Sequence, residues 1–159
     1  MDIRVGYGYD VHALAPSLPL IICGVKIEHE KGCIAHSDGD VAIHALCDAI
    51  LGAMGERDIG YHFPDTSAEY KGIDSRILLG KVILMMKNKG YRVGNLDITI
   101  VLQHPKIAPY IDSMYQSLSC IIGIGVERIS IKATTTERLG FVGKEEGIEA
   151  SAVALIIKD

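Results

Sequence analysis

The sequence has little that would suit a nucleic-acid or membrane partner. Its 159 residues carry 16 Lys and Arg against 20 Asp and Glu, which gives a formal net charge of −4. Without a basic field or a run of Lys and Arg, neither nucleic acid nor an acidic membrane surface is an expected partner. No apolar stretch reaches the roughly 18 residues that span a bilayer, and no secretion signal opens the chain. We therefore expect a cytoplasmic protein, or a plastid-stroma protein if a transit peptide has been removed.

The cysteines also lack a recognisable pattern. Cys23, Cys33, Cys47 and Cys120 show no C-x-x-C spacing, which argues against a zinc ribbon or a redox pair. We expect them to be reduced and to pack as small hydrophobic residues. Internal repeats are absent too, and the length and the 48% hydrophobic content favour a single domain over residues 1–159.

Apolar periodicity predicts strands separated by single helices. We expect strands at 3–9, 20–27, 96–102, 129–133 and 148–157, and helices at 40–54, at 74–89 and from Pro105 to about 121. Cys23-Gly24 interrupts the second strand, so an extra N-terminal hairpin is expected, and Ser37 before Asp40 resembles a capping box. The pattern favours a two-layer α+β fold, in which helices cover one face of a mixed four-stranded sheet. The uncovered face favours self-association.

Three residues of ligand type form the most informative pattern. Asp10 and His12 are two apart at a strand end, so both side chains point to one face. His44 belongs to a helix that is apolar nearly all round and therefore buried, where it shares a polar stripe with Asp40 and Asp48. One Asp and two His suit Zn²⁺ with an open fourth position, although Mn²⁺ and Fe²⁺ suit the same set. The alternative is that both histidines are core residues satisfied by hydrogen bonds.

Other polar segments suit a phosphorylated ligand. The segment 132–137, KATTTE, follows a strand, and its amides suit a phosphate while Glu137 suits Mg²⁺; the alternative is that its threonines reflect β-propensity. Asp58 and Asp65 lie in a long Gly- and Pro-containing loop and suit either sugar hydroxyls or turn formation. His36-Ser37 precedes the helix 40–54, near its positive end, where an anion is favoured.

Taken in order along the chain, these motifs resemble the 2-C-methyl-D-erythritol 2,4-cyclodiphosphate synthase family. They are DVH at 10–12, AHSDGD at 35–40, His44, DIG at 58–60, FPDT at 63–66, PK at 105–106 and KATTTERLGFVGKEEGI at 132–148. The resemblance covers nearly the whole chain. It implies a phosphorus–oxygen lyase of the non-mevalonate isoprenoid pathway, which closes 4-diphosphocytidyl-2-C-methyl-D-erythritol 2-phosphate into a cyclic diphosphate and releases CMP.

The resemblance also implies roles for individual residues. Asp10, His12 and His44 would bind one Zn²⁺ per subunit, and Glu137 would hold Mg²⁺ or Mn²⁺ between the substrate phosphates. His36 and Thr135 would stabilise the transition state. The implied substrate-binding residues are Asp10, Val11, His12, His36, Ser37, Asp58, Ile59, Gly60, Phe63, Pro64, Asp65, Thr66, Ser67, Leu102, Gln103, His104, Pro105, Lys106, Ile107, Ala108, Thr134, Thr135, Thr136, Glu137, Phe141 and Lys144.

The implied assembly is a homotrimer. Its sheets would face the three-fold axis, its active sites would lie between subunits, and a central cavity holds isoprenoid diphosphates in some members of the family. Tyr7 and Tyr9 stand where His and Phe are frequent in the family, and His104 stands where a small residue is usual. Two other functions fit the same residues: a metal-dependent phosphohydrolase, and a non-catalytic trimeric module with structural zinc.

Overall fold

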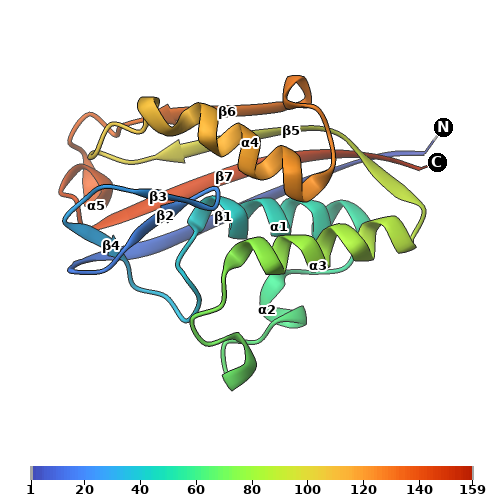
Figure 1. Ribbon diagram of the computed structural model, residues 1–159, viewed down its shortest axis with the longest axis horizontal. Helices are drawn as coiled ribbons and strands as arrows, with labels where there is room; N and C mark the ends of the chain where they lie inside the picture. The colour runs from blue at the N-terminus through green and yellow to red at the C-terminus, as the bar shows by residue number, and fades with distance from the viewer. Residues whose placement is uncertain (1, 159) are drawn as a thin grey trace.

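The computed structural model describes residues 2–158 (Figure 1). Its strands are β1 (Ile3–Pro16), β2 (Leu20–Ile22), β3 (Val25–Ile27), β4 (Lys31–Cys33), β5 (Tyr91–Val101), β6 (Ile129–Thr134) and β7 (Gly147–Lys158). Its α-helices are α1 (Val41–Met54), α2 (Ile59–His62), α3 (Ser75–Asn88), α4 (Ile111–Ile122) and α5 (Gly140–Gly143). Short 3₁₀ helices span Ala68–Tyr70, Ala108–Tyr110 and Val126–Arg128.

The main sheet is mixed, as expected, but it has five strands rather than four. Its order is β4-β1-β7-β5-β6, with β5 and β6 parallel and the other neighbours antiparallel. The additional strand is β4, which pairs with residues 14–16 of β1 at the edge of the sheet. Three residues with Gly32 at their centre carry too weak a strand pattern to be found from sequence. The predicted hairpin is confirmed as β2 and β3, joined through Cys23 and Gly24 at positive φ.

Two predicted element boundaries differ from the structure. β1 continues to Pro16 instead of ending near residue 9, because it pairs with β7 as far as Ala13 and then with β4. The third long helix does not begin at Pro105 but in the 3₁₀ turn at Ala108. Pro109 takes the first-turn position there, where a proline loses no hydrogen bond.

The predicted capping box before α1 is wrong. Asp40 itself caps the helix, since its Oδ1 accepts the N–H of Ile43 at 3.0 Å. The same carboxylate accepts the N–H of Cys23 at 2.9 Å and of Gly24 at 2.6 Å. Asp40 therefore ties the β2–β3 turn to the start of α1, and it is fully buried.

Helices α1, α3 and α4 lie together on one side of the sheet (Figure 1). The residues that alternate toward them on β5 and β7 are buried, among them Ile98, Ile100, Ala152 and Ile156. None of the described helices combines the length and the apolar character needed to cross a membrane.

β1 and α1 approach each other more closely than side chains would allow. A Cβ at Gly6 would overlap the carbonyl oxygen of Ala49, and one at Gly8 would overlap that of Ala45. Both alanines are themselves fully buried. The step from Gly6 to Gly8 along β1 thus corresponds to the step from Ala49 back to Ala45 along α1. Continued in the same direction, it places Asp10 and the residues after it near the first turn of α1.

The opposite face of the sheet is exposed and apolar over β1 and β7. We define the free sheet face as Ile3, Val5, Tyr7, Tyr9 and Val11 of β1, which are 44% to 64% exposed, together with Val153 of β7. The Tyr9 hydroxyl donates to Oε2 of Glu149 at 2.7 Å, and this bond is the main reason that the pKa of Tyr9 rises to about 12.

Gly8→Ala is expected to lower the free energy of unfolding by at least about 2 kcal/mol, because the new methyl group meets the backbone of α1 rather than a movable side chain. Gly52→Ala is the matched control, since a Cβ there meets nothing within 4 Å on the exposed side of the same helix. This control should raise the stability by about 0.5–1 kcal/mol. Urea denaturation measures both, and wild-type stability for Gly8→Ala would contradict the close approach.

Candidate metal centre and active site

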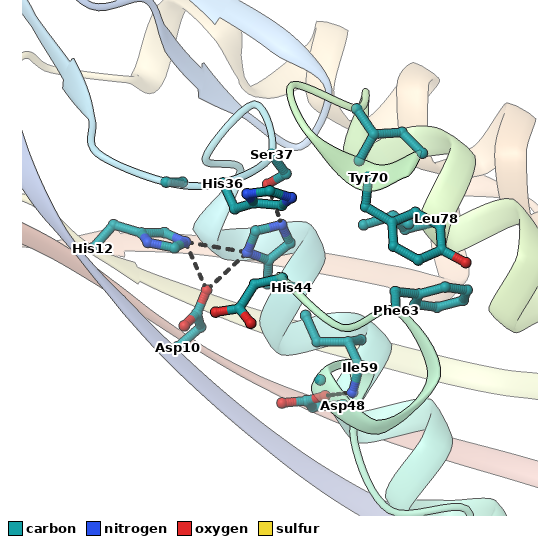
Figure 2. Close-up of a pocket in the computed structure, with 14 residues that line it drawn as sticks. Asp10, His12, His36, Ser37, His44, Asp48, Ile59, Phe63, Tyr70 and Leu78 are labelled. Atoms are coloured by element: carbon teal, nitrogen blue, oxygen red, sulfur yellow. Dashed lines mark hydrogen bonds and ion pairs between the residues drawn. The ribbon is translucent and has the colours of Figure 1, made fainter. Parts of the chain in front are cut away.

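The ends of β1 and α1 bring three ligand-type side chains to one point. Asp10 and His12 project from the helix-facing side of β1, and His44 comes from the first turn of α1. The Oδ2 atom of Asp10 lies 2.9 Å from Nε2 of His12 and 3.0 Å from Nδ1 of His44. The two ring nitrogens are 3.1 Å apart, and Figure 2 shows the three groups converging.

The donor set and its spacing fit a zinc ion. In a tetrahedral site with ligand distances of 2.0–2.2 Å, neighbouring ligand atoms lie about 3.3–3.6 Å apart. The three separations, 2.9, 3.0 and 3.1 Å, fall below this range by a few tenths of an ångström. Within residues 2–158, Asp10, His12 and His44 are the group of His, Cys, Asp or Glu residues whose ligand atoms gather in this way. Three donors leave one position for a ligand, which is typical of catalytic zinc.

Asp10 and His44 stabilise each other's charged forms. Burial disfavours the charge of Asp10, but hydrogen bonds with His12 and His44 outweigh burial and hold the pKa of Asp10 below its usual range. Burial also opposes a charge on His44, whereas the hydrogen bond with Asp10 raises its pKa, so the net shift is upward. The centre therefore favours positive charge beside the Asp10 carboxylate, a place that a divalent cation takes when it displaces a proton.

The second ring nitrogen of His44 faces the hydroxyl groups of Ser75 and Ser37, a pairing that the sequence did not predict. Its Nε2 lies 2.9 Å from Oγ of Ser75 and 3.1 Å from Oγ of Ser37. Ser75 opens α3, is fully buried, and its hydroxyl contacts Oδ1 of Asp38 at 2.5 Å. Sequence analysis missed Asp38 and Ser75 as site residues, because their patterns indicated only a loop and a helix start.

A cavity of about 340 Å³ opens beside the three ligands (Figure 2). Of the predicted site residues, it brings together Asp10, His12, His36, Ser37, His44, Ile59, Gly60, Phe63 and Asp65. Residues that were not predicted to bind substrate complete the wall, namely Ala35, Asp48, Tyr70, Ile73 and Leu78. The loop before α1, the segment around α2 and the start of α3 thus form one enclosure.

Two aspartates hold the α2 segment in place. Asp48, one helical turn beyond His44, accepts the N–H of Ile59 at 2.8 Å, and burial raises its pKa. Asp58 accepts the N–H of Tyr61 at 2.9 Å and so caps α2. The second arrangement agrees with the turn-forming alternative for Asp58.

Among the predicted substrate-binding residues between positions 10 and 67, five do not line this cavity, namely Val11, Asp58, Pro64, Thr66 and Ser67. Val11 lies on the free sheet face, because its side chain alternates with those of Asp10 and His12. Ser67 contributes through its backbone: its carbonyl oxygen lies 3.1 Å from Nε2 of His36, which fixes the His36 ring over the cavity.

A second pocket of about 290 Å³ lies at the C-terminal ends of β5 and β6. It brings together the predicted residues Leu102, Gln103, Pro105, Lys106, Ile107, Ala108, Thr134 and Thr135, with Ala133 beside them. His104 does not line it; its side chain is 59% exposed and points toward Glu145, with 4.0 Å between Nε2 and Oε1. β7 separates β1 from β5 in the sheet, so the metal centre and this pocket belong to different parts of the chain.

The segment 134–137 forms a tight turn beside the second pocket. The Thr136 hydroxyl donates to the Leu139 carbonyl at 2.6 Å, and the Glu137 N–H donates to Oγ1 of Thr135 at 3.2 Å. Glu137 and Arg138 both have positive φ, and the Glu137 side chain is exposed. Lys132 does not join this turn, because its ammonium group donates to Asp97 at 2.8 Å.

Two further predicted residues lie near α5. Phe141 lines a third hollow of about 350 Å³ together with Thr136, Leu139 and Glu149. Lys144 caps the C-terminal end of α5, and its N–H donates to the carbonyl of Gly140 at 3.1 Å. Neither residue lines the cavity beside the metal centre.

Comparison with known proteins gives a consistent result. The sequence profile of the YgbB family matches residues 3–157. The chain is 55% identical to 2-C-methyl-D-erythritol 2,4-cyclodiphosphate synthase of Bacteroides thetaiotaomicron, with 100% of each protein aligned. It is 57% identical to the protein of the same name from Photobacterium profundum over 97% of this chain and 98% of that one.

Solved structures agree with these matches. The bifunctional IspDF of Campylobacter jejuni superposes with a TM-score of 0.96 at 38% identity, over 99% of this chain and 43% of that one. The IspF–CDP complex of Plasmodium falciparum superposes with a TM-score of 0.87 at 36% identity, over 99% of this chain and 97% of that one. With the whole chain matched in sequence and in fold, the protein belongs to the 2-C-methyl-D-erythritol 2,4-cyclodiphosphate synthase (YgbB) family.

Proposed function

We propose that this protein converts 4-diphosphocytidyl-2-C-methyl-D-erythritol 2-phosphate into 2-C-methyl-D-erythritol 2,4-cyclodiphosphate and CMP. An oxygen of the 2-phosphate attacks the β-phosphorus, and the bond from that phosphorus to CMP breaks. The observation that carries the proposal is the three-donor centre, open on the side of a cavity lined by residues of the loops before α1 and around α2. Relatives named for this activity align with the chain from end to end. The product serves the non-mevalonate route to isoprenoid precursors.

In this proposal Asp10, His12 and His44 hold Zn²⁺, and Glu137 holds Mg²⁺ or Mn²⁺. Such cations act as Lewis acids and neutralise phosphate charge when bound. The attacking phosphate is already ionised at neutral pH, so the chain has no base to supply for it. Its side chains instead have to position the two phosphate groups and exclude water, whose attack is the competing reaction.

His36 and Thr135 are proposed to stabilise the charge that develops during the attack. His36 lies just before α1, near the positive end of the helix, and its ring is oriented by the Ser67 carbonyl. Thr135 lines the second pocket, and the N–H of Glu137 donates to its hydroxyl oxygen. Both groups are therefore held in place before substrate arrives, which is how transition-state charge is stabilised most effectively.

The substrate is proposed to span both pockets. The cavity beside the metal centre takes the methylerythritol part, and the pocket of Leu102–Ala108 with Thr134–Glu137 takes the cytidine and diphosphate, aided by Phe141 and Lys144. Each pocket has a volume near the lower end of the range for small-molecule sites. Because β7 separates them within one chain, we propose that each site combines the metal centre of one subunit with the second pocket of its neighbour.

For this arrangement we propose a homotrimer, in which the free sheet faces meet around the three-fold axis. The apolar side chains of β1 on this face are 44% to 64% exposed in the single chain, and a contiguous patch of this kind usually marks an interface. A closed symmetric ring of three copies covers the patch on each subunit. A central cavity for an isoprenoid diphosphate stays a prediction of the resemblance, and Tyr9 with Glu149 would give it a polar pair.

A cytoplasmic location belongs to the same proposal. Cys23, Cys33, Cys47 and Cys120 are all free thiols, and the first three are buried. Unpaired cysteines support a reducing compartment.

Phosphorus NMR of the purified protein with substrate, Zn²⁺ and Mg²⁺ tests the reaction. We expect the cyclic diphosphate and CMP in equal amounts, since one bond forms as the other breaks. Release of inorganic phosphate would identify a phosphohydrolase instead. No turnover, combined with unfolding on removal of the metal, would identify a structural zinc module.

His36→Ala is expected to lower kcat by about 10²–10³-fold, the usual cost of removing one group that stabilises transition-state charge. The zinc content should stay at the wild-type value, because His36 is not among the three metal ligands. His29→Ala is the matched control, since this histidine lies outside the cavity. Equal activity of the two variants would remove His36 from the catalytic set.

Val5→Asp is expected to convert the trimer, with three times the 17.2 kDa mass of one chain, into monomers. The new carboxylate would be buried without a partner where three copies meet. Leu84→Asp on α3 is the control, because Leu84 is 59% exposed and Val5 is 64% exposed. Light scattering after gel filtration measures the mass, and a trimeric Val5→Asp variant would show that the free sheet face is not the interface.

A further inference from the structure

A chain of three side chains leads from the metal centre into the protein. We propose that Asp38 and Ser75 are positioning residues, which keep a proton of His44 on Nε2 and turn Nδ1 toward Asp10 and His12, where a metal ion would bind it. The inference rests on the metal centre proposed above, but it concerns residues that no expectation assigned to that centre. The hydrogen bonds along Asp38, Ser75 and His44 determine which of their atoms carry a proton.

Asp38 can only accept in this arrangement. Its Oδ2 accepts the backbone N–H of Ser75 at 2.9 Å, and its Oδ1 accepts the backbone N–H of Asp40 at 3.1 Å. Both carboxylate oxygens thus face groups that can do nothing but donate. The 2.5 Å contact between Oδ1 and Oγ of Ser75 is then an O–H donating to a carboxylate, and charge-assisted bonds of this kind are short.

Ser75 has one hydroxyl proton, which it donates in the hydrogen bond to the carboxylate of Asp38. The Oγ atom can therefore only accept from His44, whose Nε2 lies 2.9 Å away and must carry the proton. The reverse tautomer would set two lone pairs against each other at this distance. Ser75 is fully buried and His44 is 6% exposed, so an unpaired polar contact there would be costly.

Ser37 does not change this assignment. Its Oγ lies 3.1 Å from the same Nε2 and accepts the N–H of Gly39 at 3.3 Å. If Ser37 donated to Nε2, the buried contact between Ser75 and His44 would have no proton at all. Ser37 therefore shares the Nε2–H as a second acceptor, and its own proton is left for the cavity that it lines.

These hydrogen bonds would orient the His44 ring for the metal centre before a metal ion binds. With one proton fixed on Nε2, Nδ1 points toward Oδ2 of Asp10 at 3.0 Å and Nε2 of His12 at 3.1 Å. Without metal, an Nδ1 proton donates to Asp10, and a bound cation takes the place of that proton while the Nε2 proton stays. Hydrogen bonds to the far nitrogen of a ligating histidine fix its tautomer and its ring orientation, and losing one typically costs 10- to 100-fold in metal affinity. The start of α3 thereby orients a ligand that belongs to α1.

The first test measures Zn²⁺ affinity by competition with a chromophoric chelator. Ser75→Ala is expected to bind Zn²⁺ about 10- to 100-fold more weakly than the wild type. Asp38→Asn should lose a similar factor, because its amide group can turn the Ser75 hydroxyl toward His44. Ser75→Thr keeps the hydroxyl and should recover affinity to within about threefold of the wild type. Wild-type affinity in both Ser75→Ala and Asp38→Asn would overturn the proposal.

Asp74→Ala is the matched control for the helix start. Asp74 caps the same end of α3, but its carboxylate binds the N–H and the guanidinium group of Arg76. Its removal should weaken the helix end and leave Zn²⁺ affinity within about twofold of the wild type. An equal loss in Asp74→Ala and Ser75→Ala would mean that α3 acts only as structural support, which would also overturn the proposal.

A second measurement locates the proton directly. Long-range proton–nitrogen NMR correlations of the histidine rings should show His44 protonated at Nε2 in both the metal-free and the zinc-loaded wild type. This proton should exchange with water at least about tenfold faster in Ser75→Ala. An unprotonated Nε2 would refute the positioning role. If the wild type binds no Zn²⁺, the proposed centre fails, while the metal-free spectrum still decides the proton's place.

Discussion

The close approach of α1 to β1 is the constraint on which the rest of the site depends. Gly6 and Gly8 leave no side chain between the strand and the backbone of α1 at Ala45 and Ala49. A helix that rests directly on a strand has little freedom to slide or tilt, because any movement brings backbone against backbone. His44 is fixed on α1 one residue before Ala45, so its distance from the ligands of β1 is set by main-chain packing rather than by flexible side chains.

The packing of α1 on β1 buries polar groups beside it, and these groups need hydrogen-bond partners. Asp40 is fully buried, which raises its pKa to about 6, although the N–H groups of Ile43 and Gly24 oppose the shift. Its bonds join the β2–β3 turn to the start of α1, while Asp38 joins that start to α3. Each carboxylate thus accepts hydrogen bonds from the backbone of a distant segment. The β2–β3 turn, the start of α1 and the start of α3 are joined in this way next to the candidate metal centre.

The sequence allowed prediction of those features that depend on local periodicity. Asp10 and His12 follow from the two-residue repeat of a strand, and His44 from a polar stripe on a helix that is otherwise buried. The contact between Asp38 and Ser75 joins residues 37 apart, and each pattern alone indicated only local structure. Likewise, β4 is recognisable only through its pairing with β1. Pro105 and Pro109 both suit a first turn, and the pattern alone placed the start of the third long helix at the wrong one of the two. These features arise from tertiary packing, which a single sequence does not display.

β1 serves both faces of the sheet at once. Gly8, Asp10 and His12 point toward the helices, while Tyr9 and Val11 alternate with them on the free sheet face. In the proposed trimer, a subunit that packs against this face would contact the same strand that carries two of the three proposed ligands. The bond from Tyr9 to Glu149 adds a side-chain link to the backbone pairing of β1 and β7 beside Asp10. The proposed subunit contacts and the candidate metal ligands would thus lie on one strand, so a substitution that shifts β1 would affect both.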